Sequence, residues 1–272
     1  MDLDLSSYFS QAMRMYNSSS QIAREVTESW ARDNLYCPRC GSPLQQYKDN
    51  TKVYDFYCNH SNQIFVLLPS SKDDFQLKST KSFPHNYFPS RIMGAEYHTT
   101  VRSLREGTFP SLILLHYNPY QKEVRDCLFI HRLSVTMNSI GRRNPLGESA
   151  RRRNWVGSEI LLNNIPEVGR IEVIQAGEIV PTETVMNQWT RVENILKGDF
   201  EKRGWISDVM RVIDGMQETF TLEDVYSYES GLEDLHPDNK HIKDKIRQQL
   251  QILRDRGYLK FISRGKYQKL KK

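Results

Sequence analysis

Apolar residues recur along the chain with two spacings, one typical of helices and one typical of strands. Near the N-terminus Ile22, Val26 and Trp30 are four residues apart, which predicts a helix over Ser18 to Arg32. Runs rich in β-branched and aromatic residues predict strands at Lys52 to Tyr57, Phe75 to Lys78, Ser111 to Tyr117, Arg125 to Leu133 and Arg170 to Gln175. The pattern therefore predicts a mixed α/β architecture for most of the chain.

A different periodicity begins beyond Gly204. Three further helices are expected: one containing Ile206, Val209 and Ile213, a short one opened by Thr221 with Glu223 and Asp224, and a strong one carrying Ile242, Ile246, Leu250 and Leu253. Two short strands, Tyr258 to Ser263 and Lys266 to Leu270, flank Arg264-Gly265, a turn that permits positive φ. Three helices followed by a hairpin are typical of a winged helix-turn-helix.

The change of periodicity also predicts the domain organisation. A polar helix over Thr184 to Leu196 ends near Gly198, between the two patterns. A chain of 272 residues is long enough for two domains. We predict an α/β domain over 1–185, a linker helix over 186–204 and a winged helix over 205–272.

Composition fits an ordinary soluble protein, with 38% hydrophobic and 26% charged residues. No apolar run approaches the roughly 20 residues that a membrane span needs, and Met1 to Ser10 carries acids where a signal peptide carries bases. We therefore expect a cytoplasmic protein with no membrane partner. In that compartment thiols stay reduced, so metal binding or packing explains the cysteines better than disulfides do.

The net charge of +5 is concentrated at the C-terminus. From Lys240 to Lys272 there are 12 Lys or Arg residues against two acids, Asp244 and Asp255. Such a concentration favours a polyanionic partner, and the alternative is a solvated helix face with a frayed tail.

In a winged helix the third helix enters the major groove of DNA and the wing contacts phosphates. Lys240, Lys243, Arg247 and Arg254 lie in one arc beside the apolar stripe of the third predicted helix, and Arg264, Lys266 and Lys269 lie on the predicted wing. These positions predict a double-stranded DNA partner, with a winged helix that contacts proteins as the alternative.

Cysteines at finger-like spacing indicate a structural metal site. Cys37 and Cys40 are separated by two residues, and Cys58-Asn59-His60-Ser61 offers a thiolate and an imidazole downstream. Two residues between thiolates let both reach one ion, which predicts Zn²⁺ held by Cys37, Cys40, Cys58 and His60, with unliganded thiols as the alternative. Cys127 lies in an apolar run and is expected in the core.

Asp55 and the run Phe75-Gln76-Leu77-Lys78 follow a pattern that resembles the PD-(D/E)XK nucleases. Strand side chains alternate, so Gln76 and Lys78 share a face. In this chemistry a carboxylate and a neighbouring oxygen ligand hold Mg²⁺, which activates water and stabilises charge on the phosphate, while a lysine orients the water.

The chain resembles the DpnI-type methyl-directed restriction endonucleases over nearly its whole length. The segments that carry the resemblance are Tyr36 to Gly41, Asp55 to His60, Phe75 to Ser79, Ala150-Arg151-Arg152 with Trp155, Phe220 to Glu229, His241 to Asp255 and Arg264 to Tyr267. The last three are the closest matches.

The resemblance implies a monomeric Mg²⁺-dependent enzyme with a zinc-bearing PD-(D/E)XK domain and a winged helix, both recognising GATC that carries N6-methyladenine. It implies Asp55, Gln76 and Lys78 as the catalytic set, with Asp55 and Gln76 as Mg²⁺ ligands. It also implies that Trp155 lies against the methyl groups. The residues expected to contact DNA are Trp155, Arg151, Arg152, Lys240, His241, Lys243, Arg247, Arg264 and Lys266.

Three departures from the family fall near the chemistry. Ser61 stands where the family has a fourth zinc cysteine, Gln76 stands where it has a metal-binding glutamate, and Val66 to Phe75 reads as an insertion before the catalytic strand. Gln76 removes a charge and should weaken Mg²⁺ binding, and Asp74, on the same predicted strand face, is a possible substitute ligand. Three hypotheses follow: an endonuclease specific for methylated GATC, a non-cleaving methyl-adenine DNA-binding protein, and a zinc-containing winged-helix regulator.

Overall fold

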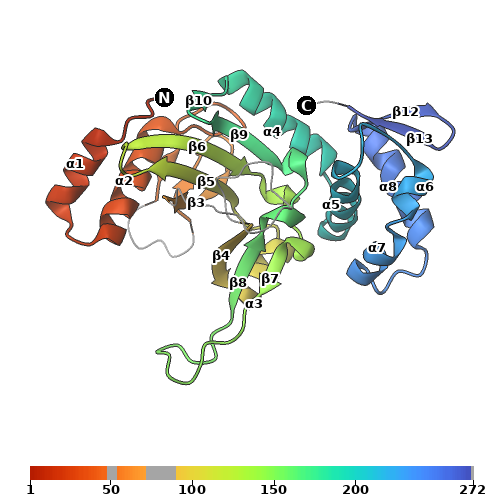
Figure 1. Ribbon diagram of the computed structural model, residues 1–272, viewed down its shortest axis with the longest axis horizontal. Coiled ribbons are helices and arrows are strands. Elements are labelled where there is room, and N and C mark those ends of the chain that lie inside the picture. The colour runs from red at the N-terminus through yellow and green to blue at the C-terminus, as the bar shows by residue number, and fades with distance from the viewer. Residues whose placement is uncertain (48–53, 72–89, 271–272) are drawn as a thin grey trace. The chain divides into compact units, whose positions relative to one another are not determined.

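The structure, a computed structural model, describes residues 1–47, 54–71 and 90–270 (Figure 1). The chain divides into two compact units. The first comprises residues 1–90, 110–132 and 170–190, and the second comprises residues 91–109, 133–169 and 191–272. Each unit is therefore assembled from segments that are far apart in sequence.

A seven-stranded sheet forms the centre of the first unit. Its strands are β1 (Gln45–Gln46), β2 (Phe56–Tyr57), β3 (Ile64–Ser70), β5 (Ser111–Asn118), β6 (Glu123–Ile130), β9 (Arg170–Gln175) and β10 (Glu178–Ile179). They lie in the order β1-β2-β3-β5-β6-β9-β10. Neighbours are antiparallel except β3 and β5, which are parallel.

Three helices contribute to this unit: α1 (Ser6–Met15), α2 (Ser19–Asn34) and the greater part of α4 (Thr182–Ile195). On α4, Trp189 is fully buried, with its ring centroid 6.2 Å from that of Phe65 on β3 and 6.2 Å from that of Phe129 on β6. On α2, Trp30 is fully buried and donates its indole N–H to the Asp2 carbonyl at 2.7 Å. Every residue of β5 from 111 to 117 is buried, so the sheet is covered on both faces at its centre.

The second unit begins with β4 (Arg91–Glu96) and α3 (Tyr97–Arg105), and continues with β7 (Ile140–Arg142) and β8 (Gly157–Leu161). The three strands form an antiparallel sheet in the order β4-β8-β7. Short 3-10 helices lie at Arg132–Ser134, Met137–Ser139, Leu162–Asn164 and Glu167–Gly169.

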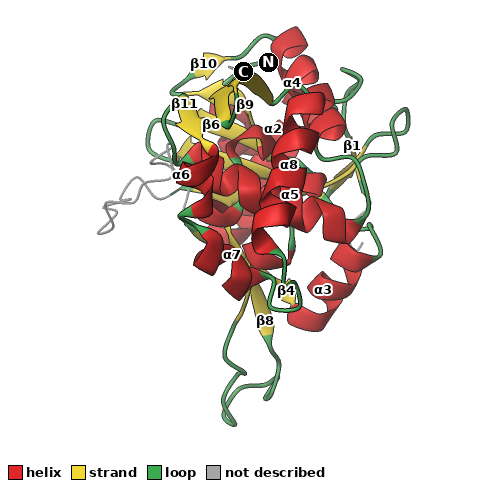
Figure 2. Ribbon diagram, turned by 90° about the vertical axis from the view of Figure 1, so that its right-hand side faces the viewer, coloured by secondary structure: helices red, strands yellow, loops and turns green. Residues whose placement is uncertain are grey.

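The rest of the second unit is a bundle of helices with a small sheet. Its elements are α5 (Phe200–Asp214), β11 (Thr219–Thr221), α6 (Leu222–Tyr226), α7 (Glu229–Leu235), α8 (Ile242–Asp255), β12 (Leu259–Ser263) and β13 (Lys266–Lys269). The sheet order is β11-β13-β12. Helix α8 contacts α5, α6, α7 and β12 and is therefore central to this bundle (Figure 2). Among the described helices, none has the length and apolar character needed to cross a bilayer.

Most of the predicted elements are confirmed. The helices expected at 18–32 and 184–196 are α2 and α4, and the strands expected at 111–117 and 170–175 are β5 and β9. The strand expected at 125–133 is β6, which ends at Ile130 because the chain turns into a 3-10 helix at Arg132. The strand expected at 75–78 lies outside the described residues, as do the first two residues of the one expected at 52–57.

The C-terminal elements are also confirmed, with additions. The three predicted helices are α5, α6 and α8, and the two predicted strands are β12 and β13. Helix α7 and strand β11 were not predicted. Helix α5 begins at Phe200, after Asp199 accepts a hydrogen bond from the Lys202 N–H at 2.8 Å, so it crosses residue 205 without a break.

Candidate functional site

The structure gathers three of the predicted zinc ligands. The side-chain sulfurs of Cys37, Cys40 and Cys58 all lie within 4.8 Å of one another. Burial raises the pKa of the Cys37 thiol to about 12. Burial acts in the same direction on Cys40, but hydrogen bonds with Ser42, Cys58 and Cys37 together outweigh it and lower that pKa to about 7. Three thiols at this separation fit a Zn²⁺ ion, which prefers tetrahedral sulfur ligands.

His60 does not join this cluster. It is exposed and lies outside the group formed by the three thiols. The hydroxyl of Ser61 lies there instead, with its oxygen 3.1 Å from the Cys37 sulfur. Cys127 is fully buried, as expected of a core residue, and burial raises its pKa.

Asp55 is held where β2 begins to pair with β3. Its backbone N–H donates to the Phe65 carbonyl at 3.0 Å, and its carboxylate accepts the Leu67 N–H at 2.7 Å. Burial raises the pKa of Asp55, and the hydrogen bond from Leu67 and the charge of Arg24 oppose that rise. The strand thus fixes a half-buried carboxylate, which is one component of the predicted Mg²⁺ site.

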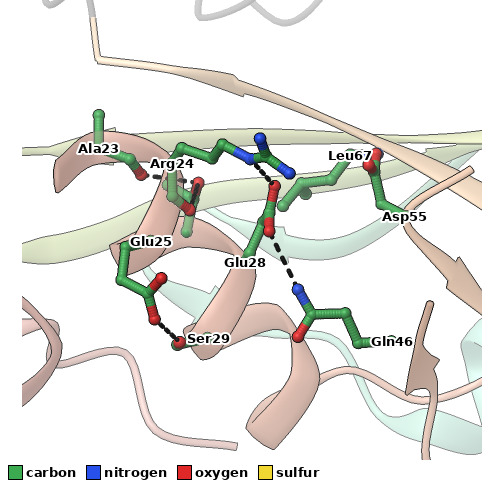
Figure 3. A network of polar contacts seen from close by, with 9 residues as sticks. Ala23, Arg24, Glu25, Glu28, Ser29, Gln46, Asp55 and Leu67 are labelled. Carbon is green, nitrogen blue, oxygen red and sulfur yellow. Dashed lines mark hydrogen bonds and ion pairs between the residues drawn. The ribbon is translucent and has the colours of Figure 1, made fainter. Parts of the chain in front are cut away.

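A second carboxylate, Glu28 on α2, lies close to Asp55 (Figure 3). Arg24 donates to one of its oxygens at 2.6 Å and Gln46 donates to the other at 3.0 Å. Burial raises the pKa of Glu28, and the nearby charge of Asp55 adds to that effect. Glu28 was not predicted from the sequence, because no spacing in the chain connects a helix residue with a strand 27 residues later.

Strand β3, whose Leu67 N–H binds the Asp55 carboxylate, supplies no side-chain oxygen along its first five residues, because Ile64, Phe65, Val66, Leu67 and Leu68 are all apolar. Gln76, Lys78 and Asp74 lie outside the described residues. Of the three predicted catalytic residues, the structure therefore places Asp55. The stretch from Val66, expected as an insertion, begins as part of β3, between β2 and β5 in the sheet.

In the second unit, α8 has one apolar face and one basic face. Ile242, Ile246, Leu250 and Leu253 are buried, whereas Lys243, Arg247 and Arg254 are exposed. His241 is the N-cap residue and Lys240 precedes it, both exposed. The predicted basic surface is therefore present and accessible to solvent.

Tyr226 at the end of α6 organises two of these side chains. The Lys243 ammonium lies 5.4 Å and the Arg247 guanidinium 5.6 Å from its ring centroid, within the range of cation–π attraction. Lys243 also forms an ion pair with Glu229 on α7 at 3.3 Å. Tyr226 was not predicted from the sequence, because its role follows from the packing of α6 on α8.

The wing and the β7–β8 loop carry the remaining predicted DNA contacts. Gly265 has φ +71° at the turn between β12 and β13, and Arg264 and Lys266 beside it are exposed. In the loop between β7 and β8, Arg151 and Arg152 are exposed. Trp155 is half-buried there, and its ring lies against Gly157, where an added Cβ would be 2.8 Å from Cζ3.

Both parts of the chain match known protein families. Residues 3–198 match the DpnI family, described as the Dam-replacing family, and residues 201–269 match the Dam-replacing HTH domain. The first match ends between α4 and α5, and the second begins in the first turn of α5 and covers the whole of α8 and the wing. The chain therefore belongs to the DpnI, or Dam-replacing, family and carries the C-terminal helix-turn-helix domain of that family.

Proposed function

We propose that this protein binds double-stranded DNA containing N6-methyladenine at GATC, and that α8 and the β12–β13 wing form its reading surface. The observation that carries the proposal is the exposed basic face of α8, with Lys243 and Arg247 one helical turn apart and the apolar face packed into the bundle. A helix of this kind can enter the major groove, where arginine makes bidentate contacts to base edges. Family membership supports recognition or cleavage of adenine-methylated DNA.

The test is fluorescence anisotropy with three duplexes of equal length: methylated GATC, unmethylated GATC, and a scrambled sequence. We expect the tightest binding to the methylated duplex, and weaker, strongly salt-dependent binding to the other two. Equal affinity for methylated and unmethylated GATC across a salt titration would mean that the protein binds DNA without recognising the methyl group. That result would reject the proposal.

A second candidate function is Mg²⁺-dependent phosphodiester hydrolysis at the same site by a PD-(D/E)XK centre formed by Asp55, Gln76 and Lys78. It is favoured by the half-buried Asp55 carboxylate, held on the sheet by Leu67, and by membership in a restriction-type nuclease family. Mg²⁺ would supply charge stabilisation at the phosphate and an activated water. The apolar side chains of β3 beside Asp55 instead favour binding without cleavage.

Incubation of methylated and unmethylated plasmid, with Mg²⁺ or with a chelator, separates the two candidates. Cutting of methylated DNA alone, lost in Asp55→Ala with DNA affinity retained, supports the nuclease. Retardation of methylated DNA without any cutting supports a non-cleaving reader. Equal binding to methylated and unmethylated plasmid, without cutting, supports a winged-helix regulator.

We further propose that Cys37, Cys40 and Cys58 hold a structural Zn²⁺ ion. The close approach of the three thiols supports this assignment, since three sulfurs at this separation can reach one ion. Elemental analysis of protein purified without chelator should give about one equivalent of zinc, and less than about half an equivalent would contradict the proposal.

A further inference from the structure

The two halves of the cysteine cluster have the same backbone geometry. In the first half, the Cys37 carbonyl accepts the N–H of Gly41 at 2.8 Å, and the Cys37 N–H donates to the Ser42 carbonyl at 2.7 Å. In the second half, the Cys58 carbonyl accepts the N–H of Asn62 at 2.9 Å, and the Cys58 N–H donates to the Gln63 carbonyl at 2.9 Å. The partners are four and five residues downstream in both halves.

Both turns also end with a left-handed residue. Gly41 has φ +74° and Asn62 has φ +55°, and glycine and asparagine are the residues that adopt this region most easily. The two halves therefore correspond residue by residue. Position 61 corresponds to Cys40, and position 60 corresponds to Arg39.

The side chains follow this correspondence. Arg39 and His60 are both exposed, as equivalent positions should be. Ser61 lies on the side of the thiols, with its hydroxyl oxygen 3.1 Å from the Cys37 sulfur, while the Cys40 and Cys58 sulfurs are 3.5 Å apart. The backbone directs residue 61, and not residue 60, toward the centre of the cluster.

We infer that the metal site is completed by the hydroxyl oxygen of Ser61, and that His60 is not a ligand. This inference rests on the proposed Zn²⁺ site and concerns only its fourth position. A neutral hydroxyl is a weaker ligand for Zn²⁺ than a thiolate, and a site with three strong protein ligands resembles open zinc sites more than closed structural ones. We therefore expect the zinc to exchange more readily than it would from four thiolates.

The experiment is a Co²⁺ titration of the full chain and of three variants, His60→Ala, Ser61→Ala and Ser61→Cys, each first compared with the parent by circular dichroism. Co²⁺ reports its ligands through visible absorption bands, and competition with a chelator gives the affinity. We expect His60→Ala to match the parent in spectrum and affinity, and Ser61→Ala to bind more weakly. Ser61→Cys should bind more tightly than the parent, with added thiolate-to-metal absorption.

Several results would overturn the inference. One is a changed spectrum or a loss of affinity in His60→Ala. Another is an unchanged affinity in Ser61→Ala, which would assign the fourth position to water or to another group. Failure of the parent chain to bind Co²⁺ or Zn²⁺ would reject the site as a whole. The DNA-binding proposal is measured separately by anisotropy, because α8 and the wing contain none of these residues.

Discussion

Arg247 and Lys243 share the ring of Tyr226, but Lys243 is also paired with Glu229. We therefore predict that Arg247→Ala weakens binding to methylated GATC by about 1–3 kcal/mol, as expected for loss of a bidentate base contact. Lys243→Ala should cause a smaller loss of binding free energy. Anisotropy titrations measure both losses. Lys197→Ala is the matched control, because it removes the same charge from an exposed position outside α8. Equal losses of DNA affinity in all three variants would mean that binding depends only on the net charge of the protein.

Lys266 beside the wing turn should behave differently, because a phosphate contact carries no base information. Lys266→Ala is expected to lower the affinity for all three duplexes by the same factor. The slope of log K against log salt should become shallower by about 0.9, the value for one released counterion. A selective loss on the methylated duplex would instead place Lys266 at a base edge.

The nuclease candidate depends on whether Gln76 lies at the metal. If Gln76 lies at the metal, Gln76→Glu restores an anionic oxygen beside Asp55 and should strengthen Mg²⁺ binding and raise the cleavage rate. Single-turnover cleavage of a methylated duplex across a Mg²⁺ titration measures both effects. Gln121→Glu, at an exposed position, adds the same charge to the first unit as a control. An unchanged rate and Mg²⁺ dependence in Gln76→Glu would remove this residue from the metal site.

Helix α6 is started by a reciprocal pair of hydrogen bonds between Thr221 and Asp224. The Asp224 carboxylate accepts the Thr221 N–H at 2.7 Å, and the Thr221 hydroxyl accepts the Asp224 N–H at 3.2 Å. Helix α6 presents Tyr226 to the basic residues of α8, so its start affects the reading surface. We expect Thr221→Ala to lower the free energy of unfolding by about 1 kcal/mol in urea denaturation at neutral pH.

The same hydrogen bond from the Thr221 backbone, followed by that from its side chain, lowers the pKa of Asp224. An acid whose pKa is lower in the folded state contributes stability above its unfolded pKa and loses that stability as pH falls through the folded pKa. The difference in stability between the parent and Asp224→Asn should therefore be present at neutral pH and disappear in acid. A difference that stays constant down to pH 3 would show that the carboxylate charge is not involved.

In the second unit as a whole, Asp208 connects three segments. It is 1% exposed, accepts the Asn138 side-chain N–H at 2.5 Å, and lies 2.9 Å from the His236 Nε2, whose ring stacks on Trp205 at 3.7 Å. These contacts join α5, the 3-10 helix Met137–Ser139 and the end of α7.

Removal of Asp208 takes this acceptor from its half-buried partners, Asn138 and His236. We expect Asp208→Ala to destabilise this unit by about 1.5–3 kcal/mol, the range for hydrogen bonds to charged groups. Urea unfolding followed by tryptophan fluorescence measures the change. Asp244→Ala, an exposed acid on α8, should stay within about 0.5 kcal/mol of the parent. Equal effects of the two substitutions would show that the Asp208 contacts contribute nothing to the free energy of unfolding.

The local sequence pattern was sufficient to predict many of the helices and strands. The four-residue spacing in α2 and α8, the continuous apolar run of β5 and the turn at Arg264-Gly265 were all readable from sequence, because periodicity and turn chemistry are properties of neighbouring residues. The basic face of α8 and the pair Cys37 and Cys40 were predicted on the same grounds.

Several elements were missed, β3 among them, and so were most contacts between distant segments, apart from the approach of Cys58 to Cys37 and Cys40. Strand β3 joins the sheet through its pairing with β2 and β5, and α3 and the β4-β8-β7 sheet draw on segments more than 40 residues apart. The approach of Glu28 to Asp55 and the direction of Ser61 toward Cys37 belong to this class. Spacing alone favoured His60 as the fourth ligand, whereas the family resemblance pointed to position 61. The left-handed turn at Asn62 favours position 61, because it fixes which side chain faces the cluster.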